Sequence, residues 1–163
     1  MKSIPNETLT KILADLFAEA YTGPNHAYTW FINNEPGSGL LETLENVSAE
    51  DASSPQPSGS SIAAHTEHLR WSLAVANAFT RGETPQMNWA ESWSVTTVDV
   101  DAWNKLRASL KSEYEALHQA IQQQQDVSDE QMLTALLAFT PHAAYHLGAI
   151  RQMVPFAALE QES

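Results

Sequence analysis

The chain has 163 residues, no cysteine and a formal net charge of −12 at pH 7. This length predicts one domain over residues 1–163, and the acidic charge argues against nucleic acid and anionic membranes as partners. The lack of cysteine excludes disulfides, thiolate metal ligands and a cysteine nucleophile. No apolar run reaches the roughly 18 residues of a membrane span, and the N-terminus lacks the apolar core of a signal peptide. We therefore expect a cytoplasmic protein.

The first predicted helix runs from about residue 7 to residue 21. Its apolar side chains follow the spacing of one helix face: Leu9, Ile12, Leu13, Leu16, Phe17 and Ala20. Residues 24–60 are rich in Pro, Gly, Ser and Asn and predict a long connection, with a short helical piece at about 40–47. Within it, residues 53–61 are expected to form a loop.

The second predicted helix runs from about residue 61 to residue 81, and Gly82 is a natural stop. Its apolar stripe is formed by Ile62, Leu69, Leu73 and Ala76. Residues 83–98 contain Trp89 and Trp93 but show little periodicity, so we expect a packed loop there.

The third predicted helix runs from about residue 101 to residue 125, with Asp99 or Asp101 as its cap. Its apolar positions alternate three- and four-residue steps: Trp103, Leu106, Leu110, Tyr114, Leu117 and Ile121.

The fourth predicted helix, at about 128–154, should begin with a capping box formed by Ser128 and Gln131. Its apolar stripe includes Leu136, Leu137 and Leu147 and covers much of its circumference, which is typical of a helix in the middle of a bundle. Pro141 predicts a kink inside it. With no convincing strand, these helices predict an all-α, four-helix bundle, whose interior can gather side chains around a metal ion.

Two histidine pairs stand on predicted helices. His142 and His146 are four residues apart, so one helix face presents both imidazoles, as metal binding requires. His65 and His68 lie on the second helix, where periodicity favours His65 as the inward residue. An edge position near the mouth of the bundle would suit His68 as a ligand open to solvent. The pattern leaves this choice open.

Other candidates carry weaker signals. His26 and His118 look peripheral. Glu115 and His118 form an ExxH motif, but a di-iron bundle needs two such motifs and two further inward glutamates. Glu67 is a candidate general base or partner of a ligand, or else a surface residue. Tyr145 is either a hydrogen-bond donor near a metal or a packing aromatic.

From about Leu40 to Val154 the chain resembles the DinB-like (DinB/YfiT) superfamily. The last helix carries the family signature of histidine, three residues, histidine, a small residue, glycine, an aliphatic and a basic residue, with Ala149 in place of a frequent glutamine. Three earlier segments add to the resemblance, the second of which aligns His68 with a family histidine. The matching segments read SGLLETLENVSAEDA, SIAAHTEHLRWSL, AWNKLRASL and HAAYHLGAIRQ.

The resemblance implies a four-helix bundle with a long crossover connection. It also implies a divalent ion, usually nickel, zinc or iron, held by His68, His142 and His146. Some relatives are thiol-dependent transferases or isomerases that use a low-molecular-weight thiol, some are hydrolase-like, and dimers are common. We therefore expect a metal-dependent enzyme that acts on a small molecule, in which water or a bound thiol is activated, and a homodimer. The alternative is a non-catalytic metal-binding or stress-response interaction protein.

Overall fold

The computed structural model describes residues 4–25, 27–55 and 59–154, and all regular structure in these ranges is helical. This confirms the all-α class. None of the helices formed by these residues combines the length and apolarity needed to cross a membrane. The elements, in chain order, are α1 (Asn6–Thr22), α2 (Leu40–Glu45), α3 (Ala49–Ser53), α4 (Ile62–Thr80), the short 3₁₀ turn η1 (Glu91–Trp93), α5 (Val100–Gln123) and α6 (Glu130–Met153).

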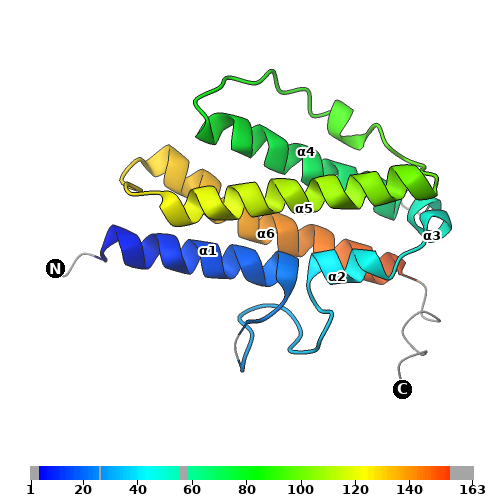
Figure 1. The fold of residues 1–163 in the computed structure, drawn as a ribbon, viewed down its shortest axis with the longest axis horizontal. Coiled ribbons are helices and arrows are strands. Elements are labelled where there is room, and N and C mark those ends of the chain that lie inside the picture. Colours follow the sequence, from blue (N-terminus) through cyan, green and yellow to red (C-terminus); the bar gives the residue numbers. More distant parts are fainter. Residues whose placement is uncertain (1–3, 26, 56–58, 155–163) are drawn as a thin grey trace.

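The four long helices pack side by side around one core (Figure 1). α4 lies against α5 along much of its length and also contacts α6, while α1 packs on both α5 and α6. The apolar stripe predicted for residues 101–125 is correct, since every one of its six members is buried. Asp99 is the cap of this helix, because its carboxylate accepts a hydrogen bond from the backbone N–H of Ala102 at 2.7 Å.

The prediction of α6 as a central helix with its apolar stripe buried is wrong on one face. Leu136 and Leu147 are buried, but Leu137 is 50% exposed and Tyr145 is 71% exposed. The apolar content of α6 therefore exceeds what its neighbours α1 and α4 cover. Ile12 of α1, also expected on the inward face, is likewise 45% exposed.

The start of α6 also differs from the prediction. The cap is Asp129, which accepts a hydrogen bond from the backbone N–H of Met132 at 2.7 Å, rather than Ser128. A carboxylate is favoured there because its charge opposes the positive end of the helix dipole. The helix continues through Pro141, and the predicted kink stays a prediction.

The connection from α1 to α4 contains two short helices, of which only α2 was predicted. The signal for α3 is Ser48, whose hydroxyl accepts from the backbone N–H of Asp51 at 3.0 Å in a capping arrangement. Residues 56–58, inside the loop expected at 53–61, lie outside the described residues.

The connection from α4 to α5 is held against the start of α4 by side-chain hydrogen bonds. The hydroxyl of Ser61, the N-cap of α4, donates to the carbonyl of Thr96 at 2.8 Å, and the N–H of Val98 donates to the hydroxyl of Ser53 at 2.9 Å. These bonds attach the end of the connection, just before α5, to α3 and α4, and η1 also lies beside α4. Most residues of 83–98 are exposed, so the predicted packed loop is packed only in part.

Gly39 allows α2 to begin directly against the end of α1 (Figure 1). A Cβ atom at this position would lie 2.3 Å from the backbone nitrogen of Gly23 and 2.6 Å from the carbonyl carbon of Thr22. Backbone atoms cannot yield as a side chain would, so only glycine fits this contact.

Two matched glycine substitutions test this close approach. We expect Gly39→Ala to lower the free energy of unfolding by about 1–3 kcal/mol, as overpacking does. Gly148→Ala on α6, where a Cβ would meet nothing within 4 Å, should raise it by about 0.5–1 kcal/mol, since alanine is the better helix former. Urea unfolding measures both free energies, and equal effects of the two variants would contradict the close backbone contact at Gly39.

Candidate metal centre

Three histidines from two helices converge between α4 and α6. His68 comes from α4, His142 and His146 come from α6, and one nitrogen of each lies within 4.8 Å of one nitrogen of the others. His68 and His146 are 7% and 3% exposed, and His142 is half-buried. The structure therefore brings together the three residues that the family resemblance selected.

The spacing of the nitrogens suits a chelated ion. Nε2 of His68 lies 3.1 Å from Nε2 of His142. Two nitrogens bound at about 2.05 Å to one tetrahedral ion would lie about 3.3 Å apart. The nitrogens of His68 and His142 are thus spaced to bind one divalent transition metal with only small side-chain movements.

The cluster is electrically neutral at pH 7. Burial, together with the charge of a protonated His142 or His65, lowers the pKa of His68 to about 4. Burial and the same type of repulsion lower the pKa of His146 to about 3, and burial also lowers the pKa of His65 and of His142. Neutral imidazole is the form that binds metal, so the site needs no deprotonation near neutral pH.

His65, which periodicity favoured as the inward residue, is as buried as His68, at 7% exposed. Its Nδ1 lies 2.7 Å from Nδ1 of His146, and it is not part of the three-histidine group. This contact leaves Nε2 of His146 as the nitrogen available to an ion. Both histidines of α4 therefore face inward, and the packing of α6 decides which of them joins the three-histidine group.

Tryptophans of the α4–α5 connection cover the cluster. The ring of Trp93 stacks on that of His68, with centroids 4.3 Å apart and planes 21° apart, and it meets His65 edge-on at 5.3 Å. Trp89 lies 6.2 Å from His68 and packs on Trp71. The sequence places these tryptophans in a predicted loop and does not indicate their contact with the histidines, because no periodicity links the two segments.

Among the other candidates, both carboxylate oxygens of Glu67 accept hydrogen bonds from Arg70 at 2.7 Å, so this side chain is engaged in an ion pair. Tyr145 meets His146 edge-on but is largely exposed. His118 stacks on Tyr114 of α5, and Glu115 is exposed, so the ExxH motif does not join the cluster. His26 lies outside the described residues.

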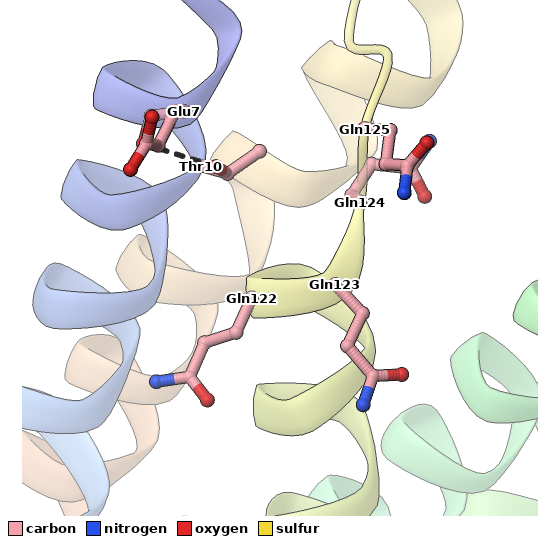
Figure 2. Close-up of a pocket in the computed structure, with 6 residues that line it drawn as sticks. All are labelled: Glu7, Thr10, Gln122, Gln123, Gln124 and Gln125. Carbon is pink, nitrogen blue, oxygen red and sulfur yellow. Dashed lines mark hydrogen bonds between the residues drawn. The ribbon is translucent and has the colours of Figure 1, made fainter.

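A surface hollow lies away from the histidines. It has a volume of about 680 Å³ and sits where α1 begins and α5 ends (Figures 1 and 2). Its side chains are those of Glu7, Thr10 and Gln122–Gln125. Figure 2 shows the side chains of Gln122 and Gln123 pointing in different directions, away from those of Gln124 and Gln125. The hollow therefore offers polar surface but no clustered donors, and the histidines remain the best candidate site.

No family model matches this chain, and neither does any curated protein or solved structure. The resemblance to the DinB-like superfamily therefore stays a prediction from the sequence motifs.

The neutral cluster predicts a loss of stability in mild acid. An unfolded histidine binds a proton as the pH falls through about 6.5, whereas His68 and His146 stay neutral in the fold down to about 4 and about 3. Protons therefore favour the unfolded state across this window. We expect the free energy of unfolding of the metal-free protein to fall from pH 7 to pH 4.5.

The double variant His68→Gln/His146→Gln should show a shallower fall over the same range in urea unfolding. His118→Gln is the control, because it removes one imidazole that lies outside the cluster. Parallel pH profiles for the double variant and the control would contradict the assignment of the effect to these two residues.

Proposed function

We propose that this chain is a metal-dependent enzyme of the DinB-like superfamily, built as a four-helix bundle with a long crossover connection. In this proposal His68, His142 and His146 hold one divalent ion, of nickel, zinc or iron. The reaction is thiol transfer to, or hydrolysis of, a small molecule. The observation that carries the proposal is the convergence of three neutral imidazoles from α4 and α6, two of them buried and one half-buried.

Three protein ligands favour catalysis over a structural role. Structural zinc sites are usually closed by four protein ligands, whereas catalytic sites use three and leave a position for water or substrate. Within the described residues, the group that could hold an ion has three members, and His142 is half-buried rather than enclosed. Such a site supports exchange of a small ligand from solvent.

The side chains have separate tasks in this mechanism. The three imidazoles are uncharged at neutral pH, so they hold an ion without cancelling its charge. An ion bound in this way supplies Lewis acidity, which lowers the pKa of water or of a small thiol. The ring of Trp93, which stacks on that of His68, shields one face of this imidazole from water. The chain has no cysteine, so a thiol nucleophile would have to come from a second small molecule.

The alternative is a non-catalytic metal-binding or stress-response interaction protein of the same fold. It shares the ion and the ligands, and differs in whether a substrate reacts. The substrate, the thiol, the homodimer and the cytoplasmic location stay predictions.

Metal binding is tested by replacing the histidines one at a time. Protein purified without a nickel column and loaded with zinc should contain about one ion per chain, whereas His142→Ala and His146→Ala should contain less than a tenth of that. His65→Ala should keep the stoichiometry but bind about 10–100-fold more weakly, because it removes a partner of His146. Elemental analysis and competition with a chromogenic chelator measure both quantities.

The control for this series is His118→Ala, which removes a histidine of α5 and should bind metal as the wild type does. Loss of stoichiometric binding in His65→Ala with full binding in His68→Ala would show that the ligand from α4 is the wrong one. Less than a tenth of an equivalent in the wild type would count against every metal-based function.

Catalysis is tested with loaded and metal-free protein on two model reactions. One is the transfer of a low-molecular-weight thiol to an activated aryl halide, and the other is the hydrolysis of an activated ester. We expect metal loading to accelerate one of them at least tenfold, and His142→Ala to abolish that gain. Full metal occupancy without acceleration of a panel of such substrates would favour the non-catalytic alternative.

A further inference from the structure

Ser92 is a buried polar residue in an otherwise exposed turn. It is the middle residue of η1, and its side chain is 0% exposed, whereas Glu91 and Trp93 on either side are exposed. A buried hydroxyl needs hydrogen-bond partners to offset its loss of water. Its two partners are the carbonyl of Trp89 and the ring of His68.

Counting protons determines the direction of both bonds. The hydroxyl of Ser92 lies 2.7 Å from the carbonyl oxygen of Trp89, and a carbonyl can only accept. The single hydroxyl proton is therefore donated to Trp89. The contact of 2.8 Å between Oγ of Ser92 and Nδ1 of His68 must then take its proton from the ring, so Nδ1 of His68 carries a hydrogen.

This assignment determines the tautomer of His68. A neutral imidazole has one N–H, and with that hydrogen on Nδ1 the lone pair is on Nε2. Nε2 is the atom that lies 3.1 Å from Nε2 of His142. Without metal, the proton in that contact belongs to His142.

We propose that Ser92 is a positioning residue, which holds His68 in the Nδ1–H tautomer and so presents Nε2 as the donor atom to the metal ion. This inference deepens the proposed function and depends on it for the identity of the ion. A side chain that fixes the tautomer and orientation of a metal-binding histidine typically strengthens metal binding.

The neighbouring residue restrains the same ring in a second way. Trp93 stacks on His68 with planes 21° apart, which limits tilting of the imidazole, whereas the bond to Ser92 limits its flipping. Consecutive residues of η1 therefore fix both the plane and the direction of the ligand from α4. The connection is in turn held by Ser61, through the carbonyl of Thr96.

The first test needs no metal. Nitrogen-15 NMR of the metal-free wild type at pH 7 distinguishes the two tautomers of each histidine, and we expect His68 to carry its hydrogen on Nδ1. In Ser92→Ala the Nε2–H tautomer, which free histidine prefers, should become substantially populated. A wild-type His68 with its hydrogen on Nε2 would overturn the proposal, whether or not any Ser92 variant folds.

The second test measures zinc affinity by competition with a chelator. We expect Ser92→Ala to bind one zinc ion per chain about 10–100-fold more weakly, and Ser92→Thr, which keeps the hydroxyl, to remain within about threefold of the wild type. Ser61→Ala is the matched control. It removes another buried hydroxyl that bonds a carbonyl of the same connection, so it loosens this segment and the capped start of α4 while leaving the bond between Ser92 and His68 in place.

The outcomes separate this inference from the proposed function. Equal losses of affinity in Ser92→Ala and Ser61→Ala, or an unchanged affinity in Ser92→Ala, would overturn the positioning role while leaving the metal site intact. A wild type that binds no zinc would remove the proposed function and with it the role of Ser92 as a support for a metal ligand. The NMR result would still decide the direction of its hydrogen bond.

Discussion

The candidate site depends on the packing of α4 against α6. His68 and His142 are 74 residues apart in the chain, yet their Nε2 atoms lie 3.1 Å apart. The helical repeat alone places His142 and His146 on one face of α6, but these two imidazoles make only part of the three-histidine group. The third imidazole comes from α4, which shares a core with α6. Any change that shifts one helix against the other therefore also changes the ligand geometry.

Burial keeps the clustered histidines neutral, which suits metal binding, but it also lowers the stability of the fold in acid. Imidazoles buried together lose their hydration and disfavour the protonated form, which keeps their lone pairs available near neutral pH. Unfolded histidines have no such restriction, so acid favours the unfolded chain. A bound cation would offset this loss of stability, because it would stabilise the folded state alone. One arrangement of side chains therefore underlies both the proposed metal binding and the predicted acid sensitivity.

The irregular α4–α5 connection completes the site. It supplies the hydroxyl of Ser92 and the ring of Trp93, both of which contact His68. Functional groups commonly lie on connections that a rigid scaffold positions. Here the scaffold is α4, whose N-cap Ser61 and whose neighbour α3 both hold the connection in place. The exposed side chains of Leu137 and Tyr145 show that the neighbours of α6 cover only part of its surface.

The sequence by itself determined the helical class, the approximate limits of the four long helices and the inward stripe of α5, because these follow from local periodicity. It also identified His142 and His146 as a pair, since a helix fixes their spacing. Periodicity left His65 and His68 unresolved, missed α3 and overestimated how much of α6 is buried. Tertiary structure decided those points, because burial and the partner of each α4 histidine depend on which surface of a distant helix lies opposite. It alone revealed Ser92, whose role depends on two hydrogen bonds that no local pattern encodes.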